Sequence, residues 1–241
     1  MENYNLDKLV RPNVAVLEPY SSARDEFKTQ GQEMVFLDAN ENPNENGLNR
    51  YPDPQQDKVK EKLAEIKKIP VSNILLGNGS DEVLDLLFRA FCEPGKDNII
   101  TLPPTYGMYK VLAGINDIEN REILLNHSFE PDVTAILNAV DNSTKMIFLC
   151  SPNNPSGNSF DPDKVRSIIE NFSGLVVIDE AYIDFSVKLS WLNNLRNYPN
   201  LIVTQTFSKA YGLAGIRLGV LYASEEIIEV LNRIKPPYNV N

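Results

Sequence analysis

Residues 73–96 read NILLGNGSDEVLDLLFRAFCEPGK, and this stretch indicates the class of fold. The apolar run ILL predicts a short strand, and GNGS after it predicts a turn. From Val83 to Phe91, apolar residues recur at the spacing of a helix, which Pro94-Gly95 ends. A strand, a turn and an amphipathic helix in this order begin the alternating pattern that is typical of α/β proteins.

The same alternation continues to the end of the chain. Helices are expected at 55–68, about 106–113, 161–172 and 224–235, and further apolar strands at 98–102, 146–152, 175–182, 201–207 and 216–223. Asp161 and Pro162 suit the N-cap and the first position of the third of these helices. Because the strands are continuously apolar, we expect an α/β fold with a mainly parallel sheet and helices on both faces.

The beginning and end of the chain are expected to differ from this patterned region. Residues 1–48 are polar and rich in turn-forming residues, so we expect an N-terminal arm or loop. Residues 49–235 are expected to form one large domain. Residues 236–241 open with Pro236-Pro237, which stops the last helix pattern.

Composition excludes several classes of function. The 241 residues carry a net charge of −10, which argues against a nucleic-acid partner because such a partner requires a basic face. No apolar run reaches transmembrane length, so no membrane is expected. Cys92 and Cys150 lie in apolar runs without CxxC spacing, which favours buried free thiols and a cytoplasmic location. With His127 as the sole histidine, no metal site is expected.

The turn GNGSDE (77–82) has two interpretations. In the first, Ser80 caps the following helix and Asp81 and Glu82 suit its positive end. In the second, the glycines and the free N–H groups of the helix N-terminus hold a phosphate. The stretch is not a P-loop, because the sequence contains no G-x-x-x-x-G-K-[ST].

Two further clusters follow predicted strands, where ligand sites of open α/β sheets lie. VVIDEAY (176–182) places Asp179 at the end of an apolar strand, and a buried carboxylate needs a charged or donor partner. A protonated ring nitrogen would serve, and Tyr182 could reach the same ligand. SPNNPSG (151–157) offers Asn154 as a donor, although a plain Pro/Asn turn also explains it.

The fourth cluster is TFSKAYGLAGIRLG (206–219). Lys209 alone would be read as a surface lysine. Thr206, Ser208 and Arg217 beside it are suitable ligands for a phosphate, and a lysine amine can form a Schiff base with an aldehyde. The stretch therefore suits an aldehyde cofactor that carries a phosphate.

Together these clusters resemble the fold-type I pyridoxal-phosphate (PLP) aminotransferases, and within them the histidinol-phosphate aminotransferases. The matching motifs are EPYSSAR (18–24), LDANENP (37–43), RYPDP (50–54), GNGSDE (77–82), SPNNPSG (151–157), VIDEAY (177–182) and TFSKAYGLAGIRLG (206–219). The last three are specific to the superfamily, whereas LDANENP and RYPDP narrow the match to the histidinol-phosphate group.

The resemblance implies a role for each matching residue. Lys209 would bind the cofactor covalently and then move the proton at the substrate α-carbon. Asp179 would pair with the protonated pyridine nitrogen, which keeps the ring an electron sink. Asn154 and Tyr182 would bond the ring oxygen O3′, and Tyr106 would stack on the ring face.

The resemblance also implies how phosphate, subunits and substrate are arranged. The residues implied to hold the phosphate are Gly79, Ser80, Asp81, Thr206, Ser208 and Arg217. Tyr51 would reach the cofactor phosphate of the neighbouring subunit, so a homodimer is implied. Tyr20 and Asn40 would lie near the substrate.

The implied reaction is amino transfer between histidinol phosphate and 2-oxoglutarate, in histidine biosynthesis, with glutamate as a product. Family members continue into a small C-terminal domain whose arginines bind the acidic groups of the substrate. The resemblance thus implies that this domain is missing here, that residues 236–241 are its start, and that the chain alone has low activity.

Other interpretations stay open at this stage. Within the superfamily, the chain could be an aromatic aminotransferase or a threonine-phosphate decarboxylase-like enzyme. From another class, a non-catalytic scaffold on the same fold would bind no cofactor. A nucleotide-binding module would need a P-loop or a G-x-G-x-x-G fingerprint, and the sequence has neither.

Overall fold

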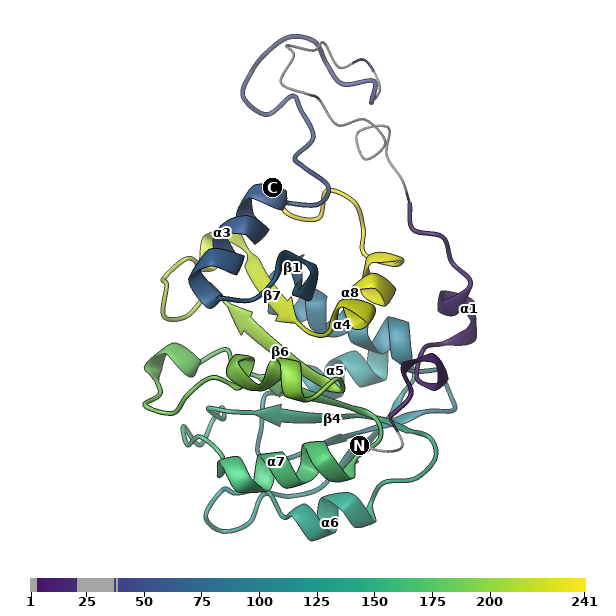
Figure 1. The fold of residues 1–241 in the computed structure, drawn as a ribbon, viewed down its shortest axis with the longest axis vertical. Helices are drawn as coiled ribbons and strands as arrows, with labels where there is room; N and C mark the ends of the chain where they lie inside the picture. The colour runs from purple at the N-terminus through teal and green to yellow at the C-terminus, as the bar shows by residue number, and fades with distance from the viewer. Residues whose placement is uncertain (1–3, 21–36, 38) are drawn as a thin grey trace.

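The computed structural model describes residues 4–20, 37 and 39–241, which include a seven-stranded sheet (Figure 1). The strands are β1 (Ile74–Asn78), β2 (Asn98–Thr101), β3 (Glu119–Glu122), β4 (Thr144–Cys150), β5 (Leu175–Asp179), β6 (Leu201–Thr206) and β7 (Leu218–Tyr222). Their order in the sheet is β1-β7-β6-β5-β4-β2-β3. β7 is antiparallel to β1 and β6, and the other pairs are parallel, which confirms the expected mainly parallel sheet.

Helices cover both faces of this sheet, as expected. They are α1 (Pro12–Ala15), α3 (Asp57–Lys67), α4 (Ser80–Phe91), α5 (Met108–Ile115), α6 (Val133–Asn138), α7 (Pro162–Asn171) and α8 (Glu225–Asn232). Successive strand side chains point to opposite faces. Leu75 thus belongs to the apolar cluster that contains α4, α5 and α8, whereas Ile74 and Leu76 belong to the cluster that contains α3, α6 and α7. Two apolar cores therefore enclose the sheet.

The sequence around the N-termini of α7 and α4 determines how each helix begins. The expected cap of α7 is confirmed, because the Asp161 carboxylate accepts from the Asp163 N–H at 2.9 Å and Pro162 is the first helical residue. The expectation that Ser80 caps α4 is wrong. Gly79 is the N-cap, with a φ of 79°, and Ser80 is the first helical residue. Glycine adopts this positive φ without strain, so it makes the turn and leaves the serine hydroxyl uncommitted.

The N-terminal segment consists of two different parts. Residues 4–20 contain α1 and a 3₁₀ turn at Leu6–Lys8, and Val10 and Val14 are buried against the α4 side of the sheet. Residues 39–50 instead stand away from the body, at the top of Figure 1. The motif EPYSSAR (18–24) lies largely outside the described residues, as does Asp38 of LDANENP.

The last residues return to the first strand. The Asn239 amide donates to the Leu76 carbonyl at 3.1 Å and to the Glu82 carboxylate at 2.7 Å. Lys235 is buried, and its ammonium donates to the Pro54 carbonyl at 3.1 Å. The segment after α8 therefore fixes the start of α3 and the end of β1.

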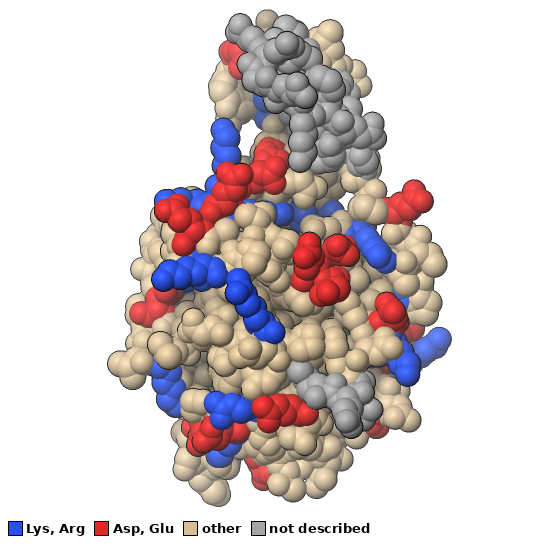
Figure 2. Space-filling model, in the orientation of Figure 1, with Lys and Arg blue, Asp and Glu red and all other residues tan. Residues whose placement is uncertain are grey.

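The surface in Figure 2 carries basic and acidic side chains interspersed with uncharged ones. On this face the described residues form no continuous basic patch, in agreement with a net charge of −10. Nor does the described part of the chain contain a helix of the length and apolarity needed to cross a membrane.

Candidate active site

The strand directions bring the four sequence clusters to one edge of the sheet. β1 and β6 run the same way because both are antiparallel to β7. The carboxyl ends of β1, β4, β5 and β6 therefore meet the start of β7 at that edge. A cavity of about 240 Å³ opens there, lined by Ser80, Asp81, Tyr106, Cys150, Asp179, Ala181, Tyr182, Thr206, Ser208, Lys209, Ala214 and Arg217. Nine of these twelve residues were predicted as site residues from the sequence.

Asp179 is the last residue of β5, and its side chain is buried at the floor of this cavity. The Tyr109 hydroxyl donates to Oδ2 at 2.7 Å, and the Ala181 N–H donates to Oδ1 at 3.1 Å. Burial raises the pKa of this carboxyl, and the hydrogen bonds oppose that rise. Both donors are neutral, so they leave the negative charge of the carboxylate uncompensated. A cationic group in the cavity would pair with that charge.

The turn before α4 and the start of β7 lie together and form a cradle of the kind that binds phosphate groups. Gly79 N–H donates to the Arg217 carbonyl at 2.7 Å, which joins the turn before α4 to the start of β7. A Cβ on Gly79 would lie 2.5 Å from Nη2 of Arg217, so the guanidinium packs directly on the turn. In the part of the chain that the structure describes, no side-chain cap holds the first turn of α4. Its N–H groups and the positive helix end therefore face the cavity beside an arginine.

The two acids of GNGSDE behave differently. Glu82 turns away, and its carboxylate accepts from the Asn78 N–H and the Asn239 amide. Asp81 lines the cavity and accepts from the Tyr106 hydroxyl at 3.1 Å. Burial, followed by the charge of Asp81, raises the pKa of Tyr106 to about 12. Tyr106 thus keeps its proton at neutral pH and donates it in a hydrogen bond to Asp81, the acid of this pair that lines the cavity.

Lys209 stands in the turn after β6, at the mouth of the cavity. Its side chain is exposed, and Nζ lies 5.6 Å from the ring centroid of Tyr182. The Thr206 hydroxyl accepts from the Ser208 N–H at 3.2 Å, which shapes the turn that presents the lysine. An accessible amine therefore faces a buried carboxylate across one small cavity.

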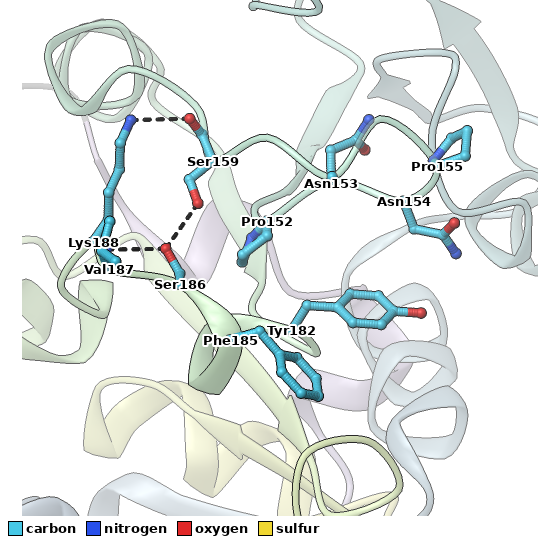
Figure 3. Close-up of a pocket in the computed structure, with 11 residues that line it drawn as sticks. Pro152, Asn153, Asn154, Pro155, Ser159, Tyr182, Phe185, Ser186, Val187 and Lys188 are labelled. Carbon is cyan, nitrogen blue, oxygen red and sulfur yellow. Dashed lines mark hydrogen bonds between the residues drawn. The ribbon is translucent and has the colours of Figure 1, made fainter.

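Asn154 lines a second cavity, of about 590 Å³, which shares Tyr182 with the first. In Figure 3 the Asn154 amide and the Tyr182 hydroxyl extend to the same side of the view. Asn153 points away, and its amide donates to the Pro104 carbonyl at 2.9 Å and to Ser156 Oγ at 2.7 Å. The second cavity thus adjoins the first at Tyr182.

Glu180 supports the far wall of this second cavity. It is buried on the other side of β5 and accepts from Ser190 Oγ at 2.6 Å, the Trp191 N–H at 2.7 Å and Gln205 Nε2 at 2.9 Å. These bonds hold residues 183–191 against β6. The sequence analysis assigned no role to Glu180 or Tyr109. Glu180 lies in VIDEAY, but only Asp179 and Tyr182 of that motif were assigned to the site, and Tyr109 belongs to none of the motifs.

Four predicted residues do not line these cavities. Gly79 forms the turn before α4, and the other three lie elsewhere. Tyr20 is exposed, as is Asn40, which has a φ of 54°. The Tyr51 ring is half exposed and stacks on Tyr238 at 4.5 Å between centroids. Within the described part of the chain, none of the three lines either cavity.

Comparison with known proteins gives one consistent family. The family model "Aminotransferase class I and II" matches residues 26–241. The chain is 75% identical to a histidinol-phosphate aminotransferase of Christiangramia forsetii and 67% identical to one of Flavobacterium johnsoniae. Each alignment covers 100% of this chain and 69% of the relative.

Solved structures show the same fold. The histidinol-phosphate aminotransferase of Sinorhizobium meliloti, solved in complex with pyridoxal-5′-phosphate, has a TM-score of 0.74 and 26% identity, over 79% of this chain and 53% of that one. The Clostridium acetobutylicum enzyme of the same name has a TM-score of 0.72 over 80% of this chain and 58% of its own, at 23% identity. This chain therefore has the fold-type I architecture and belongs to the class I and II aminotransferases, in the group of the histidinol-phosphate aminotransferases.

Proposed function

We propose that the protein is a PLP-dependent aminotransferase that transfers the amino group of histidinol phosphate to 2-oxoglutarate, forming glutamate. The names of relatives at 67–75% identity support the substrate. The observation that carries the chemistry is one cavity that combines buried Asp179, accessible Lys209 and an uncapped helix start beside Arg217. Because the chain spans 69% of these relatives' length, cofactor binding and turnover need separate tests.

The residues of the cavity fit PLP at three places. The start of α4, with Ser80, Thr206, Ser208 and Arg217, suits a phosphate. Asp179 is a buried carboxylate whose two bonded donors are neutral, so it suits a protonated ring nitrogen. Lys209 supplies the amine that an aldehyde requires. We further propose that Gly79 and Asp81 contribute backbone N–H groups to the phosphate and that Asn154 binds the ring oxygen.

The bound cofactor would supply an electron sink for the pair left behind when the α-proton of the substrate is removed. Lys209 takes that proton and returns it, because its amine is accessible at the cavity mouth. Asp179 holds a proton on the ring nitrogen by charge and hydrogen bonding, in a buried site where water does not screen the pairing. Tyr106 and Tyr182 form the walls that orient the ring.

We propose that the working form is a cytoplasmic homodimer. Tyr51 supports this, since it directly follows residues 39–50, which stand away from the body, and its ring is half exposed. In a dimer, Tyr51 would reach the phosphate of the partner subunit, and Tyr20 and Asn40 would lie near the substrate. Residues 49–235 would be the cofactor domain, with residues 1–48 as the arm.

The first test is the visible absorption spectrum of the protein mixed with PLP, beside a Lys209→Ala variant. A yellow band that borohydride reduces to a covalent product is expected, and the variant should lack that product. A protein without any such band would contradict the assignment and favour a scaffold that binds no cofactor.

The second test is amino transfer from histidinol phosphate to 2-oxoglutarate, measured as glutamate formed. Phenylalanine as donor and threonine phosphate as a decarboxylation substrate serve as controls for the two related activities. Preference for either control substrate over histidinol phosphate, in a protein that binds PLP, would overturn the proposed substrate while leaving the cofactor assignment intact.

A further inference from the structure

The Tyr109 side chain is completely buried, yet it makes a polar contact with the site. It lies on α5, and its hydroxyl donates to Oδ2 of Asp179 at 2.7 Å. The backbone N–H of Ala181 donates to Oδ1 at 3.1 Å. Each carboxylate oxygen therefore accepts at least one hydrogen bond, and donors from two separate segments set the plane of the carboxylate.

Aromatic packing fixes where that hydroxyl points. The Tyr109 ring stacks on Phe148 of β4 at 5.0 Å between centroids, and Phe148 stacks on Phe88 of α4 at 5.4 Å. On its other side, the edge of Tyr106 lies at 5.6 Å. Tyr106 lines the cavity, whereas Tyr109, three residues later, is not among its lining residues. Tyr109 therefore acts on a ligand in the cavity only indirectly, and its hydroxyl donates to Asp179.

The buried carboxylate needs this support. Burial disfavours the charged form of Asp179, and a neutral acid would not hold a proton on a ring nitrogen. A hydrogen bond donated to the charged form offsets that effect. We propose that Tyr109 is a positioning residue that keeps Asp179 ionised and aimed at the ring nitrogen of PLP. This inference rests on the proposed function and adds a residue to it.

The test compares two buried tyrosines. Tyr109→Phe removes the hydroxyl and keeps the ring packing. Tyr222→Phe is the matched control, because Tyr222 is equally buried and its hydroxyl has no hydrogen-bond partner among the described residues. Dissociation constants are measured by fluorescence titration with PLP and with its 1-deaza analogue, which carries CH in place of the ring nitrogen.

Tyr109→Phe should weaken PLP binding about tenfold, since a hydrogen bond to a charged group is lost. Binding of the deaza analogue should be unchanged, and Tyr222→Phe should bind both as the wild type does. Equal weakening for PLP and the analogue would show that Tyr109 only shapes the cavity, and no weakening at all would show that it does not support Asp179. A wild-type protein that binds neither compound would overturn the proposed function itself, together with this inference.

A double-mutant cycle gives an independent check. In an Asp179→Asn background, Tyr109→Phe should cause no further loss of PLP affinity, because its effect passes through the carboxylate. In turnover assays, Tyr109→Phe should lower kcat with the KM for histidinol phosphate unchanged. Additive losses in the cycle would contradict the proposal, as would a rise in KM alone. Thermal unfolding of each variant checks that it is folded.

Discussion

Gly219→Ala should separate α4 from β7 and damage the cradle at the start of the helix. A Cβ on Gly219 would lie 2.3 Å from the backbone nitrogen of Ser80 and 2.3 Å from the carbonyl carbon of Gly79. Normal contacts at such atoms are about 3.5 Å, so the helix start would move by about 1 Å. Both partners are backbone atoms, so no rotamer change relieves the overlap. Overpacking of this kind costs about 1–3 kcal/mol in the free energy of unfolding.

Two measurements follow from that movement. Urea denaturation should show the loss of stability, and PLP titration should show about tenfold weaker binding, because N–H groups misplaced by about 1 Å no longer match the phosphate. Gly114→Ala is the control. Gly114 lies on the exposed side of α5 with no atom within 4 Å of its Cβ position, so the variant should gain about 0.5–1 kcal/mol and bind PLP normally.

The reasoning would be refuted if Gly219→Ala unfolded within about 0.5 kcal/mol of the wild type and bound PLP with unchanged affinity. Such a result would mean that β7 and the α4 start are not in direct contact. Reduced stability with normal PLP binding would refute only the link between the helix start and the phosphate.

Three further outcomes are expected. Burial raises the pKa of Asp179 in the folded protein, so above both pKa values the ionised group opposes folding. In Asp179→Asn, the amide oxygen can accept from the Ala181 N–H and the amide N–H can donate to the Tyr109 hydroxyl, so the variant should have a higher free energy of unfolding at pH 8. A gain that did not fade as the pH fell toward 3.8 would contradict this. Glu180→Gln should lower the free energy of unfolding by about 1–3 kcal/mol, because one acceptor oxygen is replaced by an N–H donor that faces other donors. Hydrogen exchange should then become faster in residues 183–191. The Asn200 amide donates to three buried carbonyls at 3.1–3.2 Å, so Asn200→Asp should cost about 3 kcal/mol or more in urea denaturation, and a smaller loss than Asn200→Ala would argue against these bonds.

The elements that could be predicted are those whose own sequence has a clear hydrophobic pattern. Continuous apolar runs such as VVI before Asp179 indicate strands that are covered on both faces, and the structure buries every residue of β5. Polar residues that directly follow such runs meet at one edge because parallel strands share a direction. Lys209, Asp179 and Arg217 were therefore predictable as neighbours, although they lie far apart in the sequence.

The parts that were missed depend on contacts that a local pattern does not encode. β3 has the sequence ENRE, without apolar residues, and forms by backbone pairing with β2 at the sheet edge. The apolar pattern of β7 looks like that of the parallel strands, so it does not show that residues 207–217 return the chain antiparallel to β6. Tyr109 lies in a region predicted as helix, but its contact with Asp179 follows from the packing of α5 on β4 and β5.

The position of β7 between β1 and β6 also determines the order in which the sheet can form. Among the described strands, β1 is the first to be synthesised, but its neighbour is β7, the last of them, so the pairing from Ile74 to Tyr222 closes a very long loop. Contacts this distant in sequence form slowly. While the chain emerges from the ribosome, β1 has no strand to pair with, and the apolar face of α4 is incompletely covered, until residues 218–222 have been synthesised. A chain interrupted before Leu218 would leave β1 unpaired and β6 as an open edge, which is a form that associates through its strands.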